Sequence, residues 1–326
     1  MNTPIKPPLL TVRNLTKHFK IKRGFPKSVT YTVKAVDDVS FTIDEKEAFG
    51  LAGESGCGKS TVGRCILRLI QPNSGEVFLR DTNVLGLEKH QLRSMRKNMQ
   101  IIFQDPYSSL NPRRTIGQTL AEPMAVHNLY PEKEAHEVVA ALLENVGLSA
   151  NAIDKYPHEF SGGQRQRVGI ARAVLFNPDL IIADEAVSAL DVSIQMQILQ
   201  LLQNLKEKHA LSYLFISHDL AVVRHFCQRV AIMYLGRFVE LGTVTQIFDN
   251  PLHPYTVTLR NASPIPDPSV SQPFAQLKGE VPSPISPPRG CHFHPRCAKV
   301  MDICSSAYPQ WVDMGQGRGV ACHLYT

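Results

Sequence analysis

The sequence predicts an α/β fold, because short apolar strands alternate with segments of helical periodicity along most of its length. Residues 48–52, 181–183 and 213–216 are continuous apolar runs, as expected of buried parallel strands. Segments of helical spacing accompany them, at residues 61–70 and 193–205. The length of 326 residues favours about two domains.

The N-terminal segment and the middle of the chain carry different patterns. Residues 9–43 are expected to form strands, with alternation clearest from Val39 onward. Residues 20–27 carry four basic side chains together with Gly24 and Pro26, which predicts a loop between the strands. Between residues 107 and 160 the period becomes helical, most clearly at residues 135–146.

The composition is that of an ordinary globular protein, with 43% hydrophobic and 20% charged residues. It excludes a disordered chain, a collagen-like fibre and a small disulfide scaffold. The net charge of +6 permits an anionic ligand or a membrane-surface partner, but it is weak evidence for nucleic acid. Without a membrane-spanning run or a secretory signal, we expect a cytoplasmic protein, in which the seven cysteines are not first interpreted as disulfides.

The end of the chain differs in composition from the rest. Of 23 prolines, nine fall between residues 264 and 295, a density that opposes both helix and central strand. We therefore expect two parts: a domain at residues 1–245 and an irregular Pro/Cys-rich extension at residues 246–326.

Residues 53–60 fit the phosphate-binding pattern G-x-x-x-x-G-K-[ST], the P-loop. The loop follows a predicted strand and opens a predicted helix, where backbone N–H groups and the helix dipole favour an anion. Lys59 would reach the β- and γ-phosphates, Ser60 would bind Mg²⁺, and Thr61 could add a contact. The full set of candidate nucleotide-binding residues here is Gly53, Glu54, Ser55, Gly56, Cys57, Gly58, Lys59, Ser60 and Thr61.

Two further motifs carry polar groups at the ends of predicted elements. Asp184 and Glu185 end an apolar strand, where an Asp can hold Mg²⁺ and a Glu can polarise the attacking water. A small glycine-rich turn at residues 161–164 precedes a predicted helix. It is either an ordinary helix cap or a second anion site, which would be needed if two subunits shared the nucleotide.

Taken together, these motifs resemble the nucleotide-binding subunit of an ABC transporter. The resemblance covers about residues 10–250 and rests on six elements in order: residues 53–60, Gln104 after an apolar strand, residues 160–164, Asp184-Glu185, residues 188–191 and His218. It implies a P-loop NTPase cassette with an antiparallel β subdomain and a helical subdomain at about residues 105–175.

The resemblance also implies a role for each matching residue. Gln104 would lie near Mg²⁺ and the attacking water, with Ser60 and Asp184 as the other Mg²⁺ residues. Glu185 would be the catalytic base, and His218 would contact the γ-phosphate. The signature, which would close on ATP bound to the partner, comprises Ser161, Gly162, Gly163 and Gln164. Asp191 would lie in the D-loop.

The sequence departs from the family pattern at three places. Phe160 replaces the usual Leu before the signature, and Ala186 replaces the usual Pro after Glu185, so the loop beyond that residue is expected to be less rigid. The aromatic residue that stacks on adenine is not obvious. Tyr31 is the best-placed candidate, and an exposed strand tyrosine is the alternative.

Residues 250–255, 279–284 and 287–291 resemble the tail of oligopeptide/dipeptide permease ATPases. Four cysteines in this tail suit a metal, either tetrahedral zinc or a [4Fe–4S] cluster. The resemblance favours the iron–sulfur cluster; zinc, with His292, His294 or His323, and free or disulfide-bonded cysteines are the alternatives. The four cysteines are Cys291, Cys297, Cys304 and Cys322.

We therefore expect an ATPase subunit that energises import of oligopeptides or dipeptides. The expected partners are two transmembrane permeases, a second related ATPase and, indirectly, an extracytoplasmic substrate-binding protein, with no nucleic acid. The expected site is the cytoplasmic face of the bacterial inner membrane. Alternatives are the same machine with a nickel chelate, opine or antimicrobial peptide as cargo, or a soluble ABC ATPase that acts on DNA or ribosomes.

Overall fold

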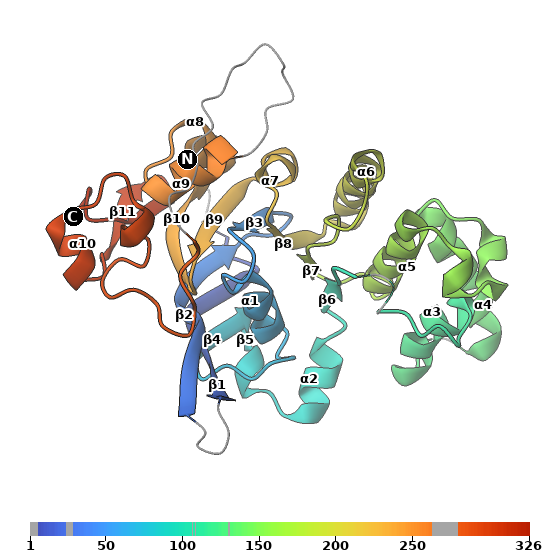
Figure 1. The fold of residues 1–326 in the computed structure, drawn as a ribbon. Helices are drawn as coiled ribbons and strands as arrows, with labels where there is room; N and C mark the ends of the chain where they lie inside the picture. The colour runs from blue at the N-terminus through green and yellow to red at the C-terminus, as the bar shows by residue number, and fades with distance from the viewer. Residues whose placement is uncertain (1–5, 24–28, 106, 108, 130, 263–279) are drawn as a thin grey trace, which may run out of the picture. The chain divides into compact units, whose positions relative to one another are not determined.

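The computed structural model describes every residue except 1–5, 24–28, 106, 108, 130 and 263–279. The chain divides into two compact units (Figure 1). The first unit contains residues 1–86 and 215–326, and the second contains residues 87–214. The chain thus begins in the first unit, forms the second and returns to the first.

The first unit opens with an antiparallel sheet in the order β2-β1-β4-β5. Strand β1 (Leu10–Arg23) pairs with β2 (Val29–Ile43) on one side and with β4 (Ser74–Leu79) on the other. The short β5 (Thr82–Asn83) continues from β4. The pairing extends to Arg23 opposite Val29, so the loop predicted from residue 20 is wrong over residues 20–23. Lys20 and Lys22 are exposed there, so this part of the hairpin accepts basic side chains that stay in water.

A second sheet of the first unit follows the order β11-β12-β10-β9-β3. Strand β3 (Ala48–Ala52) is wholly buried and pairs in parallel with β9 (Arg229–Tyr234). Strand β10 (Arg237–Thr243) returns antiparallel to β9. Strand β12 (Arg318–Ala321) pairs with β10 and with β11 (Trp311–Gly315), so the end of the chain extends this sheet.

In the first unit, helix α1 (Lys59–Ile66) follows β3. The unit also contains η1 (Val84–Gly86) and α7 (Leu220–Phe226). The C-terminal region contains α8 (Val244–Asp249), α9 (Pro254–Ala262), η4 (His294–Arg296) and α10 (Asp302–Ser306). Its described part is thus more regular than its proline content predicts, because α8, α9 and α10 lie outside the proline-rich residues 264–295. Four of the nine prolines lie within residues 263–279, outside the described residues.

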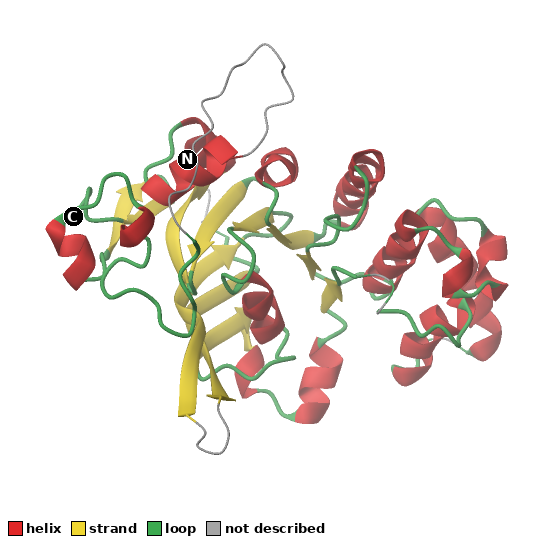
Figure 2. Ribbon diagram, viewed as in Figure 1, coloured by secondary structure: helices red, strands yellow, loops and turns green. Residues whose placement is uncertain are grey.

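The second unit is mostly helical (Figure 2). It contains α2 (Lys89–Met95), α3 (Ile116–Val126), α4 (Glu132–Asn145), η2 (Ala150–Asp154), η3 (Pro157–Glu159), α5 (Gly162–Val174) and α6 (Val192–His209). Helices α3, α4 and α5 contact one another. The helices predicted at residues 135–146 and 193–205 are α4 and α6.

Two strands of the second unit pair in parallel: β6 (Met99–Ile102) and β7 (Leu180–Asp184). All five residues of β7 are buried. Strand β8 (Ser212–Ser217), also wholly buried, runs across the boundary between the units at residue 214.

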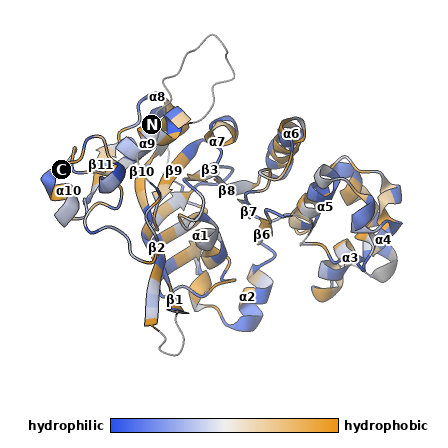
Figure 3. Ribbon diagram, in the orientation of Figure 1, coloured by the Kyte–Doolittle hydropathy of each residue, from blue (hydrophilic) through white to orange (hydrophobic). Residues whose placement is uncertain are grey.

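The buried apolar residues concentrate on the strands, and Figure 3 shows this as hydrophobic colouring along β9 and β10. Continuous apolar strands such as β3 and β7 are typical of strands covered on both faces. Within the described residues, no helix combines the length and the apolar character that crossing a membrane requires.

Candidate nucleotide-binding site

The P-loop connects β3 to α1 through a backbone path that requires glycine at two positions. Gly53 has φ +152° and Gly58, the residue before α1, has φ +111°. A Cβ atom at Gly53 would lie 2.2 Å from the carbonyl oxygen of Met233, and one at Gly58 would lie 1.9 Å from that of Ala35. Both glycines therefore serve the close packing of the loop as well as its turn.

Lys59, the first residue of α1, directs its ammonium group back into the loop. Its side chain donates to the carbonyl oxygens of Gly53 at 2.7 Å and Glu54 at 3.0 Å, and the residue is only 4% exposed. A buried cation beside the first turn of a helix, whose N–H groups lack intrahelical partners, is suited to a phosphate. Ser60 and Thr61 belong to that first turn and are half-buried.

The remaining loop residues differ in exposure. Ser55 and Gly56 are exposed, whereas Cys57 is buried with its Sγ 3.8 Å from the Lys59 Nζ. Burial raises the pKa of the Cys57 thiol, although the neighbouring Lys59 opposes the rise. The thiol is therefore neutral at physiological pH and acts as a packing group.

Glu54 is held by two residues of the C-terminal region to which the sequence analysis assigned no role at the nucleotide site. Its backbone N–H donates to the Tyr255 hydroxyl at 2.9 Å. Its carboxylate accepts two hydrogen bonds from the Arg296 guanidinium, at 2.9 and 3.1 Å. Tyr255 ends one of the quoted tail motifs, and Arg296 lies directly before Cys297, so each lay beside a signal that the sequence offered.

The other two predicted residues of the first unit lie on its surface. His218 follows β8 and is exposed, one residue before Asp219, which caps α7 through the backbone N–H of Ala221. Tyr31 lies on β2 opposite Ile21 and is 39% exposed.

In the second unit, the parallel pairing of β6 and β7 brings three predicted residues to one edge. Asp184 is the last residue of β7 and is 2% exposed. The Gln104 side-chain amide donates to the Glu185 carboxylate at 2.9 Å. Glu185 has φ +49°, a backbone conformation that is uncommon outside glycine and often marks a functional position. The edge therefore presents two carboxylates and one amide together.

The signature residues form the beginning of α5. Ser161 is its N-cap: the hydroxyl accepts from the Gln164 N–H at 3.3 Å, and the Gln164 side chain accepts from the Ser161 N–H at 2.9 Å. Ser161 and Gly162 are exposed. A Cβ atom at Gly163 would lie 2.6 Å from Ile194 Cγ2, so α5 packs closely against the beginning of α6.

Asp191 caps α6 beside this signature. Its carboxylate accepts from the Ser193 hydroxyl at 2.7 Å and from the Ile194 N–H at 3.0 Å. These hydrogen bonds lower the pKa of Asp191, and the bond from Ser193 has the largest effect. The signature and Asp191 thus cap the adjacent N-terminal ends of α5 and α6 in the second unit.

All four C-terminal cysteines line one narrow cavity, together with residues that include His294 and His323. Burial raises the pKa of the Cys291 thiol to about 11, and the other three thiols add to the rise. Over the described part of the chain, no three His, Cys, Asp or Glu side chains are grouped closely enough to hold a metal ion. The four cysteines therefore share a cavity without forming a metal-binding group within the described residues.

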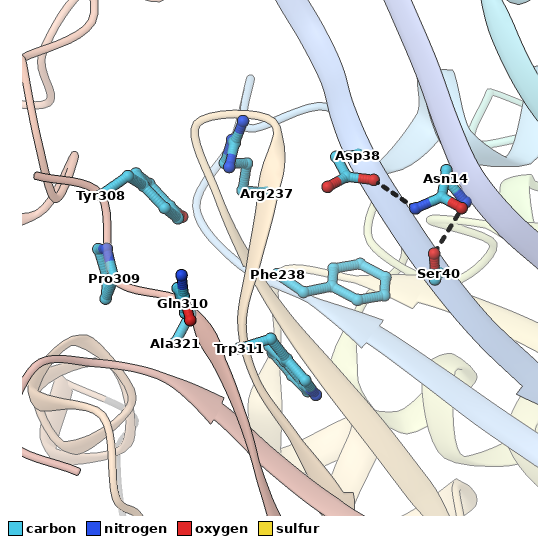
Figure 4. A pocket seen from close by; sticks show the side chains of 10 residues that line it. All are labelled: Asn14, Asp38, Ser40, Arg237, Phe238, Tyr308, Pro309, Gln310, Trp311 and Ala321. Atoms are coloured by element: carbon cyan, nitrogen blue, oxygen red, sulfur yellow. Dashed lines mark hydrogen bonds between the residues drawn. The ribbon is translucent and has the colours of Figure 1, made fainter. Parts of the chain in front are cut away.

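A separate pocket of about 500 Å³ opens in the first unit between the antiparallel strands and the C-terminal region (Figure 4). On one wall the Asn14 backbone N–H donates to the Ser40 hydroxyl, and the Asn14 side chain donates to Asp38, both at 2.8 Å. On the other wall the Arg237 guanidinium lies 4.4 Å from the centre of the Tyr308 ring. Asn14, Ser40 and Asp38 are thus hydrogen-bonded to one another, and Arg237 pairs with Asp37 at 2.8 Å.

The chain matches two protein families. Residues 36–188 match the ABC transporter family, and residues 239–304 match the oligopeptide/dipeptide transporter C-terminal region. Among solved structures it is similar to the ATP-binding cassette MJ0796, a dimer in a post-hydrolysis state with ADP and phosphate. The TM-score is 0.63 and the identity 28%, over 72% of this chain and 98% of the cassette. Fold and site together define an ABC-type ATPase.

Two relatives match over nearly the whole chain. The oligopeptide transport ATP-binding protein AppF of Bacillus subtilis is 49% identical over 98% of both chains. The probable peptide ABC transporter ATP-binding protein y4tS of Sinorhizobium fredii is 52% identical over 97% of this chain and 90% of its own. The chain belongs to the oligopeptide/dipeptide family of ABC transporter ATP-binding proteins. Subunits of this family couple ATP hydrolysis to transport together with membrane permease subunits.

Proposed function

We propose that the protein hydrolyses ATP to drive the import of oligopeptides or dipeptides across the cytoplasmic membrane. The observation that carries the proposal is the whole-length similarity to peptide transport ATP-binding proteins, which includes the C-terminal region. The geometry of the P-loop supports it, because the buried Lys59 and the start of α1 form a cradle for phosphate.

The proposed roles of the site residues follow from what each side chain can do. Lys59 and the N–H groups of residues 53–61 bind the β- and γ-phosphates. Ser60, Gln104 and Asp184 supply the hydroxyl, amide and carboxylate oxygens that suit Mg²⁺, which neutralises phosphate charge when it is bound. Glu185 accepts a proton from the attacking water, and Gln104, bonded to it, orients its carboxylate.

Three further groups complete the proposed nucleotide site. His218 contacts the γ-phosphate, and Tyr31 stacks on adenine. The exposed signature at Ser161, Gly162, Gly163 and Gln164 acts in the partner's site, where a capped helix N-terminus faces the γ-phosphate of ATP bound to the other subunit. Asp191 holds the beginning of α6 beside this signature.

The proposed assembly contains this chain, a second related ATPase and two permeases, with a substrate-binding protein on the far side. The chain lies on the cytoplasmic face of the inner membrane as a peripheral subunit. We further propose residues 1–245 as the nucleotide-binding domain, with a helical subdomain at about residues 105–175, and residues 246–326 as the C-terminal extension.

We propose that Cys291, Cys297, Cys304 and Cys322 hold a [4Fe–4S] cluster, with zinc as the alternative. The support is their shared cavity, which gathers four thiols from separate turns of the extension. Four thiolates are the ligand set that such a cluster takes. The cluster would cross-link the extension in a compartment that does not favour disulfides.

A complementation experiment tests the transport function. A strain that lacks this gene is supplied with the wild-type chain, with Lys59→Ala or with the exposed control Lys20→Ala, and uptake of a labelled tetrapeptide is measured. The wild type and Lys20→Ala should restore uptake, whereas Lys59→Ala should not. Unchanged tetrapeptide uptake in the strain that lacks the gene, with loss of nickel-chelate uptake, would overturn the proposed cargo.

A further inference from the structure

We propose that Arg296 and Tyr255, both from the C-terminal region, are positioning residues of the nucleotide site, because they fix Glu54 and through it the P-loop. The inference rests on the proposed function of that loop in binding ATP. It gives the extension a part in ATP binding, in addition to any role of its cysteines.

The ion pair between Arg296 and Glu54 is well suited to fix a loop. Two parallel hydrogen bonds, at 2.9 and 3.1 Å, join the guanidinium to the carboxylate. The side chains are 4% and 19% exposed, so water screens the pair little. Bidentate pairs of this kind define direction as well as distance, and breaking one at a buried position leaves a charge without its partner.

Tyr255 fixes the backbone of the same residue. Its hydroxyl accepts the Glu54 N–H at 2.9 Å, while the Glu54 carbonyl oxygen accepts from the Lys59 ammonium at 3.0 Å. The N–H and the carbonyl of Glu54 are thus both engaged, one by the extension and one by the phosphate-binding lysine. A change at Tyr255 or Arg296 therefore reaches Lys59 through a single residue.

The two positioning residues are themselves rigidly supported. The Tyr255 ring lies 4.6 Å from that of Tyr234 and 5.3 Å from that of Phe293, measured between ring centres. Phe293 immediately precedes η4, the 3₁₀ helix that ends at Arg296. Cys291 and Cys297, which lie before and after η4 in the chain, are two of the cysteines that line the cavity. The turn that presents Arg296 to the P-loop is therefore also the turn that joins two cysteines of the cavity.

The full-length chain with Mg²⁺ and a fluorescent ATP analogue tests the inference. Tyr255→Phe and Arg296→Gln should each raise the dissociation constant about tenfold, as expected when one buried hydrogen bond or ion pair is lost. The double variant Glu54→Arg with Arg296→Glu should regain most of the affinity that Arg296→Gln loses, because the swap restores the ion pair on which the effect depends.

Arg318 provides a matched control. It lies in the same extension, pairs with the buried Glu240 of β10 at 2.9 Å, and belongs to β12, which pairs with β10. Arg318→Gln should loosen the extension, seen as faster proteolysis, while the dissociation constant stays within about twofold. If Arg318→Gln weakens binding as much as Arg296→Gln does, general docking explains the effect and the inference is wrong.

Two further outcomes separate the inference from the function on which it rests. Lys59→Ala is measured beside the other variants. Lost affinity in Lys59→Ala with unchanged affinity in Tyr255→Phe and Arg296→Gln would overturn the inference and leave the nucleotide site standing. Unchanged affinity in Lys59→Ala would overturn the nucleotide site itself. If Arg296→Gln does not fold, Tyr255→Phe decides the question, because it removes one oxygen and keeps the ring.

Discussion

At the scale of single residues, the site combines strained backbone with defined polar contacts. Glu185 has a positive φ and accepts a hydrogen bond from Gln104 directly after the buried Asp184. The cost of such a backbone, of order 1–3 kcal/mol, is tolerated when the surroundings fix it. Gly53 and Gly58 avoid a comparable strain in the P-loop, since they lack the Cβ atom.

Replacing Glu185 by Gln should preserve ATP binding and lower the rate of hydrolysis. The amide keeps the size of the side chain but cannot accept a proton from water, and one general base contributes about 10²–10⁴-fold. Single-turnover hydrolysis of radiolabelled ATP, with the partner ATPase present, measures the effect. An unchanged rate at this chain's site would rule out Glu185 as the base.

Glu47 should make stability depend on pH. Burial raises the pKa of its carboxyl, although Arg229 at 3.4 Å opposes the rise. The folded chain then retains a proton that the unfolded chain has released. The free energy of unfolding should therefore fall as pH rises from the usual glutamate range through the raised pKa, by at most about 1.4 kcal/mol per pH unit.

The Glu47→Gln variant lacks this titration and serves as the reference. Urea unfolding of both proteins, followed by fluorescence of Trp311 in the first unit, should show the wild type losing stability relative to the variant as pH rises. Parallel pH profiles of the two proteins would exclude the effect.

At the scale of elements, helix ends carry much of the candidate chemistry. Helix α1 begins at Lys59, α5 follows the capped Ser161, and α6 follows the capped Asp191. Each end gathers N–H groups that favour an anion. A cap that uses a side chain stabilises the helix, and the N–H groups left over remain able to bind a phosphate.

Replacing Ser161 by Arg should leave ATP binding to the isolated subunit nearly intact and prevent its ATP-driven association with the partner ATPase. The substitution places a bulky cation where the partner's phosphate would dock. Size-exclusion chromatography with ATP measures association, and Ser149→Arg, at the exposed cap of η2, is the matched control. Collapse of ATP affinity in the lone Ser161→Arg subunit would mean that the signature acts within its own chain.

At the scale of the whole molecule, the C-terminal region is an integral part of the first unit. Strand β12 extends the sheet through β10, and Arg318 pairs with the fully buried Glu240. Tyr255 and Arg296 contact the P-loop. The cysteines therefore lie in a region that is already anchored, and a cluster there would tighten a turn that also presents Arg296.

The protein purified without oxygen should contain about four irons per chain and absorb broadly near 400 nm, as expected of a cluster with four thiolate ligands. Replacing any one of Cys291, Cys297, Cys304 and Cys322 by Ser should lower the iron content and speed proteolysis of the extension. Cys65→Ser, in the buried helix α1, is the control that should retain iron. Zinc without iron would favour the alternative metal, and a protease-resistant extension with neither metal would exclude both.

Much of the fold and the family was predictable because the signals are local. Strand β3, the P-loop and α1 follow one another within 19 residues, and each residue type there answers a backbone requirement. The hairpin of β1 and β2 was predicted too short, since its exposed end carries basic residues that also suit a loop. The helices and strands of the C-terminal region were underestimated, because α8, α9, α10, β11 and β12 lie outside the proline-rich residues 264–295 on which the prediction was based.

The sequence by itself determined the phosphate-binding loop, the two carboxylates at the end of β7 and the membership of a transport ATPase family. These depend on neighbouring residues, whose spacing sets the backbone geometry directly. Only the tertiary structure decided that Arg296 pairs with Glu54, 242 residues earlier in the chain, and that β12 joins β10. Neither partner carries a local pattern that specifies the other, and the contact arises because folding buries both charges in one place, where they stabilise each other.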